Sequence, residues 1–151
     1  MTNEVVVLIA EDDDGHAQLI KRNLQRSGIK NKIQRFCDGK EILDFLLNKQ
    51  DMQKLPRESY VLLLDIRMPG IDGIEVLRTL KSNPATKRLP IIMLTTTDDP
   101  QEIKRCHDLG CNTYITKPIK YENFITAIRQ LGLFLLIIEV PNIDILPVSS
   151  A

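Results

Sequence analysis

Two runs of consecutive apolar residues constrain the fold of this 151-residue chain more than any other feature. Residues 5–10 read VVVLIA and residues 60–64 read YVLLL, without alternation of apolar and polar side chains. A strand that exposes one face to water alternates, so unbroken runs of this length predict strands that are buried on both faces. Such strands occur inside parallel sheets that helices cover on both sides. The chain is therefore expected to be an α/β protein.

Segments with helical periodicity alternate with the strand candidates along the chain. The expected strands cover residues 5–10, 32–37, 60–65, 91–95 and 113–115, and the expected helices cover about 14–27, 41–47, 74–82, 99–110 and 121–134. The first helix begins at an N-cap at Asp13 or Asp14, and Gly28 follows it. Five strands that alternate with five helices predict a parallel sheet with right-handed crossover connections.

Composition restricts the classes of function. The chain has 20 Lys and Arg residues against 20 Asp and Glu residues, so no net charge favours coating of nucleic acid or of an anionic membrane. Its three cysteines, Cys37, Cys106 and Cys111, are odd in number and form no metal-binding spacing with His107, which indicates reduced thiols and a cytoplasmic protein. The apolar run 131–138 is far shorter than the ~20 residues that span a bilayer.

Charged and hydroxyl residues stand where four of the five expected strands end. Glu11 and Asp12 follow the first strand, Asp65 ends the third, Thr95 ends the fourth, and Lys117 comes soon after the fifth. Ligands of open parallel sheets bind beyond the carboxyl ends of the strands, so we expect these residues to share one site. Three neighbouring carboxylates repel one another, and Mg²⁺, which prefers oxygen ligands, would relieve that repulsion. The pattern indicates phosphoryl chemistry with Asp65 as the nucleophile.

These motifs resemble those of the receiver domains of two-component response regulators. The resemblance rests on Glu11-Asp12, on residues 62–73 (LLLDIRMPGIDG), on residues 92–96 (IMLTT) and on residues 114–118 (YITKP). It covers about residues 4–131 as a receiver domain, and residues 132–151 remain as a C-terminal apolar extension. The implied fold is the CheY-like, flavodoxin-like doubly wound (βα)5 three-layer sandwich with a five-stranded parallel sheet.

The resemblance implies a role for each acid at the site. Asp65 would accept a phosphoryl group from a sensor histidine kinase. Glu11, Asp12 and Asp65 would hold Mg²⁺ together with the backbone carbonyl of Arg67, and Asp12 would be the more direct ligand of the acidic pair. The protein would then be a phosphoacceptor in phosphorelay signal transduction, and its only catalysis would be its own phosphotransfer and dephosphorylation.

The remaining matching positions imply a switch. Thr95 and Lys117 would bind the phosphoryl group, and Pro118 would follow a cis peptide bond. Tyr114 would move inward with Thr95 and reshape the surface in a two-state transition. Each of these two residues also has a purely structural alternative. Thr95 could hydrogen-bond backbone groups only, and Tyr114 could be an ordinary aromatic residue of a strand. Many receivers have a small residue where Thr96 stands, so the lifetime of the phosphorylated form is left open.

The C-terminal part narrows the subfamily and suggests an assembly. Residues 81–90, 95–97 and 132–141 are similar to stand-alone regulators that are paired with bacterial phytochrome-type kinases. Too few residues follow the last expected helix for an output domain, so we expect output by protein contact. The apolar residues of the tail predict a homodimer through the last helix and residues 132–151, with no nucleic acid and no membrane as partner.

Two other classes of function share parts of this pattern. A haloacid-dehalogenase type phosphatase also uses an aspartate nucleophile with Mg²⁺, but it needs a second acid where Arg67 stands. A flavodoxin-like flavin binder needs a phosphate loop rich in Ser, Thr and Gly after the first strand. The acids at residues 11–14 would repel a phosphate there. The phosphatase is kept as the alternative to the receiver.

Overall fold

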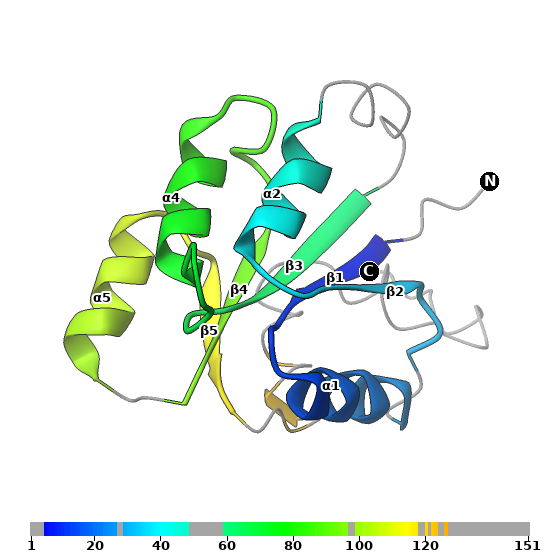
Figure 1. The fold of residues 1–151 in the computed structure, drawn as a ribbon. Helices are drawn as coiled ribbons and strands as arrows, with labels where there is room; N and C mark the ends of the chain where they lie inside the picture. Colours follow the sequence, from blue (N-terminus) through cyan, green and yellow to red (C-terminus); the bar gives the residue numbers. More distant parts are fainter. Residues whose placement is uncertain are drawn as a thin grey trace, which may run out of the picture.

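The protein forms one parallel five-stranded sheet (Figure 1). The computed structural model describes residues 5–26, 29–48, 59–96 and 99–117, together with residues 120, 122, 123 and 126. The strands are β1 (Val5–Ala10), β2 (Ile33–Phe36), β3 (Ser59–Asp65), β4 (Ile91–Thr95) and β5 (Thr113–Thr116), in the order β2-β1-β3-β4-β5. Every neighbouring pair is parallel. The predicted α/β fold with a doubly wound parallel sheet is confirmed.

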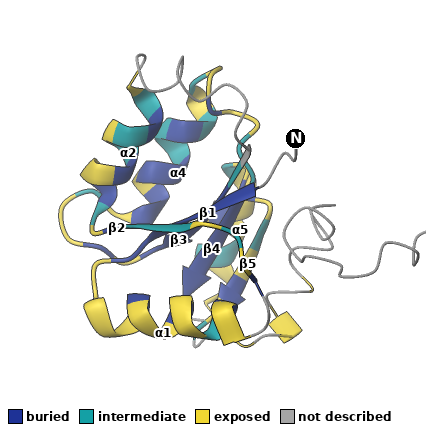
Figure 2. Cartoon of the chain, turned by 90° about the vertical axis from the view of Figure 1, so that its right-hand side faces the viewer, coloured by how far each residue is buried: buried dark blue, intermediate teal, exposed yellow. Residues whose placement is uncertain are grey.

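Helices cover both faces of this sheet. They are α1 (Asp14–Arg26), α2 (Gly39–Leu47), α4 (Gly73–Ser82) and α5 (Pro100–Asp108). Figure 2 shows α2 and α4 on one face of the sheet and α1 on the other. The fifth expected helix falls largely outside the described residues, although residues 122, 123 and 126 are helical. The C-terminal extension at 132–151 lies wholly outside them.

Aspartate residues begin all four described helices. The side chain of Asp13 accepts the backbone N–H of His16 at 2.9 Å, which makes Asp13 the cap of α1. Asp38, Asp72 and Asp99 cap the other three helices in the same way. A capping carboxylate satisfies a backbone donor that has no partner within the helix and interacts favourably with the helix dipole. The aspartate-rich turns of the sequence are therefore helix starts.

A glycine in the left-handed conformation ends α5. Gly110 has a φ of +104°, where an L side chain would be strained. The Cys111 N–H donates to the carbonyl of Cys106 at 3.0 Å, and the Gly110 N–H donates to that of His107 at 2.9 Å. This pair of bonds is the Schellman motif, and it confirms the predicted helix end at Gly110.

The core is divided into two layers by the sheet. Alternate strand residues, such as Leu8 and Leu62, pack with α2, α4 and α5, while Val7 and Leu63 pack with α1 on the opposite face. All four of these side chains are completely buried. Burial on both faces explains why β1 and β3 show no polar alternation, as the sequence predicted.

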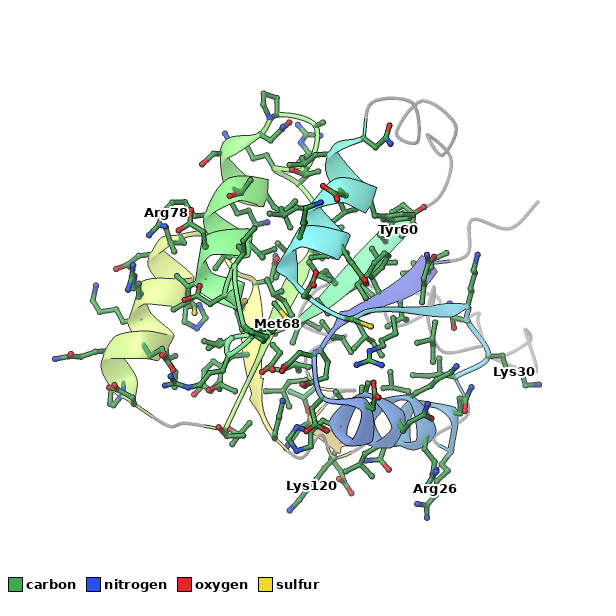
Figure 3. All side chains as sticks on the ribbon, in the orientation of Figure 1. Arg26, Lys30, Tyr60, Met68, Arg78 and Lys120 are labelled. Carbon is green, nitrogen blue, oxygen red and sulfur yellow. The ribbon has the colours of Figure 1, made fainter. Side chains whose placement is uncertain are left out.

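Three aromatic rings pack together near the start of β3, at the edge of the core layer that includes α2. The ring of Tyr60 lies beside α2 (Figure 3), edge-on to Phe45 with 5.9 Å between the ring centroids. Phe45 in turn lies 5.0 Å from Phe36 of β2. Charged side chains such as Arg78 point away from this core into solvent (Figure 3). Among the described helices, none is long and apolar enough to cross a membrane.

Candidate functional site

The carboxyl ends of β1 and β3 bring two buried acids together where the strand order reverses. Ala10 pairs with Leu64 in the sheet, so Glu11 and Asp65, the next residues on the two strands, are neighbours. Glu11 is 1% exposed and Asp65 is 5% exposed. Asp12 is exposed, and one carboxylate oxygen from each of these three acids lies within 4.8 Å of the other two. The structure thus gathers the three predicted acids into one cluster.

Lys117 from the end of β5 reaches both buried acids. Its Nζ atom lies 2.5 Å from Oε1 of Glu11 and 3.2 Å from Oδ1 of Asp65. Its backbone N–H donates to the carbonyl of Thr95 at 2.7 Å, which fixes the start of the β5–helix connection against β4. The contact with Asp65 agrees with the sequence prediction, but the closer contact with Glu11 was not foreseen.

Burial and charge shift the pKa values of this group. Burial and, after it, the negative charge of Glu11 raise the pKa of Asp65 to about 6, although the nearby Lys117 ammonium acts in the opposite direction. For Lys117, burial disfavours the charged amine, but its hydrogen bond to Glu11 and the charge of Asp65 raise its pKa overall. The lysine is therefore a permanent cation near neutral pH. Its single charge leaves the three acids with a net negative charge.

This donor set fits a hard divalent cation. Three carboxylates with one ammonium leave unsatisfied negative charge in a half-enclosed place, and Mg²⁺ and Mn²⁺ both accept carboxylate oxygen ligands. Glu11 is already engaged by Lys117 and by the backbone N–H of Asp13, whose nitrogen lies 3.1 Å from Oε2 of Glu11. Asp12 and Asp65 are the acids best able to reach a metal directly.

A glycine allows α4 to begin directly against the backbone of Asp65. The Gly73 N–H donates to the carbonyl of Ile66 at 2.8 Å. A Cβ atom at Gly73 would lie 2.1 Å from the carbonyl oxygen of Asp65, far inside contact distance. Only glycine fits here, so the Asp72-Gly73 pair both caps α4 and holds the end of β3 in place.

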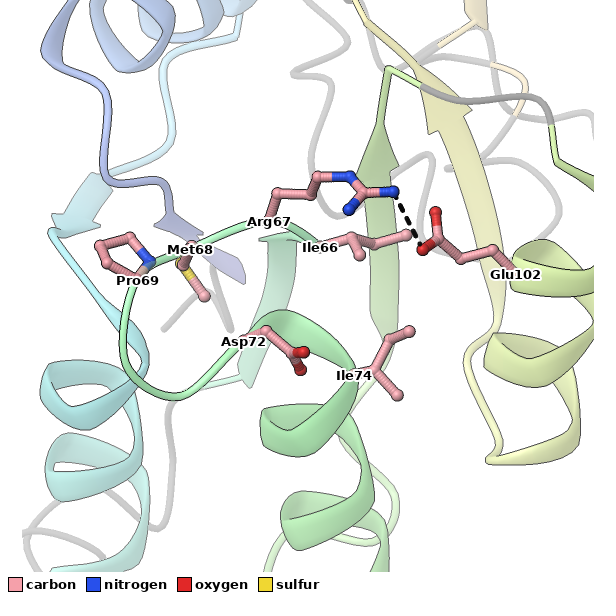
Figure 4. A pocket seen from close by; sticks show the side chains of 7 residues that line it. All are labelled: Ile66, Arg67, Met68, Pro69, Asp72, Ile74 and Glu102. Atoms are coloured by element: carbon pink, nitrogen blue, oxygen red, sulfur yellow. Dashed lines mark hydrogen bonds and ion pairs between the residues drawn. The ribbon is translucent and has the colours of Figure 1, made fainter.

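The Arg67 side chain turns toward α5. Its Nη2 lies 3.4 Å from Oε2 of Glu102, as Figure 4 shows. Both belong to a pocket of about 420 Å³ between the β3–α4 loop and α5, lined also by Ile66, Met68, Pro69, Asp72 and Ile74. Oε1 of Glu102 is buried and accepts no hydrogen bond from the part of the chain that the structure describes. Sequence reasoning missed Glu102, whose partner is 35 residues away.

The two predicted switch residues occupy different environments. Thr95, at the end of β4, is 2% exposed and follows Leu94, the sheet partner of Asp65. Tyr114 is 39% exposed, and its ring stands edge-on to that of His107 with 5.9 Å between centroids. Tyr114 therefore occupies an outward position. Pro118, with the peptide bond expected to be cis, lies outside the described residues.

Arg35 is a further residue that sequence reasoning missed. From β2 it donates through Nε and Nη2 to the backbone carbonyl of Glu11, at 3.0 and 2.8 Å. Its Nη1 lies 2.6 Å from Oδ1 of Asp14. The sequence signal was a basic residue in an expected strand opposite the acidic run 11–14, but only the strand register shows that the two meet.

Comparisons with known proteins agree with this geometry. The model of the response regulator receiver domain family matches residues 7–129. The response regulator Rcp1 of Synechocystis sp. is 30% identical over 129 residues, which cover 85% of this chain and 87% of Rcp1. The Mn²⁺-bound form of Rcp1 superposes with a TM-score of 0.68 at 28% identity, over 91% of this chain and 96% of Rcp1.

Two other solved structures are similar over most of their length. A receiver domain from Rhodospirillum rubrum is 47% identical with a TM-score of 0.71, over 90% of this chain and 96% of that one. The bacteriophytochrome response regulator RtBRR is 30% identical with a TM-score of 0.77, over 94% and 85%. These comparisons give no support to the phosphatase alternative. With its parallel sheet, its acidic cluster and its matched lysine, this chain belongs to the response regulator receiver domain family.

Proposed function

We propose that the protein is a single-domain response regulator in which Asp65 accepts the phosphoryl group. Receiver domains are phosphorylated by histidine kinases, and the family model spans most of this chain. The observation that carries the assignment is the burial of Asp65 at the end of β3, 3.2 Å from Lys117 and within the acidic cluster. Rcp1, a response regulator of comparable length, supports the single-domain reading.

The transfer would proceed by attack of an Asp65 carboxylate oxygen on phosphorus. The bond between phosphorus and the imidazole nitrogen of the kinase breaks, an acyl phosphate forms on Asp65, and the departing imidazole nitrogen takes a proton from solvent. With a pKa of about 6, Asp65 is mostly ionised at neutral pH and can act as the nucleophile. The same chemistry with water as acceptor would return the free carboxylate.

Each neighbouring residue would handle charge during this step. Glu11, Asp12, Asp65 and the backbone carbonyl of Arg67 would hold Mg²⁺, which neutralises negative charge on the carboxylates and on the phosphoryl oxygens. A Mn²⁺-bound form of the similar protein Rcp1 supports a divalent metal here. Lys117 would keep its ammonium beside the new phosphoryl oxygens.

The output would pass through a surface change and protein contact. Thr95 would bond a phosphoryl oxygen and Tyr114 would leave its outward position beside His107, which would reshape the α5–β5 surface.

We further propose a cytoplasmic protein, a phytochrome-type kinase as partner, and a homodimer through the last helix and residues 132–151. Similarity to bacteriophytochrome response regulators supports the choice of kinase. Light scattering of the full chain and of a chain ending at Gln130 tests the dimer. A monomeric mass for both proteins would contradict it.

One experiment tests the phosphoacceptor directly. The protein is incubated with acetyl phosphate and Mg²⁺, and its intact mass is measured. We expect one added phosphoryl group in the wild type and in Asp44→Asn, whose carboxylate is exposed on α2, and none in Asp65→Asn or in EDTA. A folded wild-type protein without any adduct would contradict the proposal, and turnover of small phosphate esters would favour the phosphatase.

A further inference from the structure

We propose that Arg35 is a positioning residue for the acidic loop at residues 11–14, and that it sets the affinity of the site for a divalent cation. This inference rests on the proposed function, because it concerns the metal that Glu11, Asp12 and Asp65 would hold. No matched motif of the receiver resemblance includes Arg35.

Arg35 fixes the peptide group between Glu11 and Asp12 through hydrogen bonds to its carbonyl oxygen. Two nitrogens of the planar guanidinium converge on the carbonyl oxygen of Glu11, at 3.0 and 2.8 Å. On the other side of that residue, the Glu11 N–H donates to the carbonyl of Phe36 at 3.1 Å. Both backbone polar groups of Glu11 are thus bound to β2, through Phe36 and Arg35, although β1 itself ends at Ala10. The strand pairing is in effect prolonged by a side chain.

This arrangement decides where Asp12 points. The carbonyl of Glu11 and the nitrogen of Asp12 belong to the same planar peptide group, so the two bonds from Arg35 set the direction in which the Asp12 backbone leaves the sheet. The Asp12 side chain is exposed, and no core packing orients it. Arg35 also holds Asp14, at the first turn of α1, 2.6 Å from Nη1. Both ends of the acidic loop are therefore tied to one guanidinium.

The charge of Arg35 acts against its geometric role, which makes the inference testable. A guanidinium is always protonated and repels a nearby cation, so electrostatics alone predicts that its removal tightens Mg²⁺ binding. Loss of the two bonds to Glu11 predicts the opposite, because a supporting residue around a metal site typically contributes 10–100-fold in affinity. The sign of the change in affinity separates the two effects.

The experiment measures Mg²⁺ affinity of the full chain by isothermal titration calorimetry at pH 7.5 and constant ionic strength. We expect Arg35→Met to bind Mg²⁺ about 10-fold more weakly than the wild type. Arg35→Lys keeps the charge but lacks the two parallel N–H donors of the guanidinium, so its affinity for Mg²⁺ should also fall, by several-fold. Arg22→Met removes the same charge from an exposed position on α1, and we expect it to bind as the wild type does.

A second measurement needs no metal. In ¹H–¹⁵N spectra recorded in EDTA, the amides of residues 12–14 should broaden or shift in Arg35→Met and stay unchanged in Arg22→Met. Unchanged or tighter Mg²⁺ binding by folded Arg35→Met and Arg35→Lys would overturn the inference while the proposed function stands. If Arg35→Met does not fold, Arg35→Lys decides. A wild-type protein that binds no Mg²⁺ would instead overturn the proposed function, and the inference with it.

Discussion

Lys117 lies closer to Glu11 than to Asp65, with 2.5 Å between Nζ and Oε1 of Glu11 against 3.2 Å to Oδ1 of Asp65. The lysine is thus held mainly by the residue at the end of β1, and Asp65 receives only part of its compensation. Glu11 is almost completely buried, and a buried carboxylate is stabilised by a charged hydrogen-bond partner such as this lysine. We infer that Glu11 aims the lysine, and that Asp65 is left with a carboxylate that still needs positive charge.

Removal of the lysine charge should destabilise the metal-free protein strongly. Lys117→Met leaves two buried carboxylates without a cation, and breaking a buried ion pair typically costs about 3–5 kcal/mol. Urea unfolding at pH 8 in EDTA measures this loss. Lys104→Met is the matched control, because Lys104 forms an exposed pair with Asp108 that contributes less than about 1 kcal/mol. Equal losses in the two variants would show that the buried contacts of Lys117 contribute nothing special.

The charge on Asp65 should lower the stability of the metal-free protein above pH 6. The pKa of Asp65 is about 6 in the folded protein, above the ordinary value of 3.8, because burial and Glu11 outweigh Lys117. Ionisation therefore favours unfolding, and the stability due to the protonated form is lost as the pH rises through about 6. We expect Asp65→Asn to melt at a higher temperature than the wild type at pH 8 in EDTA.

The pH dependence of that difference provides the check. At pH 4 the carboxyl is protonated in the folded wild type and partly protonated in the unfolded chain, where its pKa has the ordinary value of 3.8, so the two melting temperatures should lie much closer together than at pH 8. Thermal melts followed by circular dichroism at several pH values measure the gap. A gap that is constant from pH 4 to pH 8 would contradict the stated cause. Mg²⁺ at pH 8 should stabilise the wild type more than Asp65→Asn, because it binds the ionised carboxylate.

Local patterns predicted the sheet and the acids but not the contacts between distant segments. Burial on both faces of the sheet requires unbroken apolar runs in β1 and β3, so these runs alone were sufficient to predict the two strands. The strand ends then predicted Glu11, Asp12 and Asp65 as neighbours. By contrast, Arg35 meets Glu11 across 24 residues, and that contact depends on the register between β1 and β2.

The sequence was also insufficient to predict the contacts of long basic side chains that have more than one acid within reach. Lys117 was predicted to share the site with Asp65, but its shorter contact with Glu11, 106 residues away, was not. Arg67 stands in the matched motif, yet its side chain leaves the acids for Glu102. Nothing in a one-dimensional pattern states which of two nearby acids a long basic side chain will choose. That choice depends on loop geometry, which tertiary packing sets.

Only one of the three thiols should react in the native protein. Cys37 is exposed, whereas Cys106 and Cys111 are buried. Burial raises the pKa of Cys111 to about 12, and it also raises that of Cys106, so neither forms the reactive thiolate at pH 8. Mass spectrometry after iodoacetamide treatment at pH 8 should show one label, and Cys37→Ser should show none. Addition of urea should expose all remaining thiols, and rapid labelling of Cys111 without urea would contradict the buried position.

The close approach of α4 to β3 should make one glycine irreplaceable. In Gly73→Ala the new methyl group would meet the carbonyl oxygen of Asp65 at 2.1 Å and the Cα atom of Ile66 at 2.8 Å, and both are backbone atoms that cannot turn aside. The end of β3 or the start of α4 must move, so we expect a loss of about 3 kcal/mol in free energy of unfolding. Because Asp65 moves with its backbone, Mg²⁺ affinity should fall as well.

Gly70→Ala is the matched control for that variant. Gly70 has a φ of +76°, but a Cβ atom there would meet nothing within 4 Å, so the substitution introduces backbone strain of about 1–2 kcal/mol without a clash. Urea unfolding and Mg²⁺ titration of both variants give two independent readouts. We expect Gly70→Ala to keep its Mg²⁺ affinity and Gly73→Ala to lose affinity and stability together. If Gly73→Ala bound Mg²⁺ as tightly as Gly70→Ala, the backbone contact between α4 and Asp65 would have no part in forming the site.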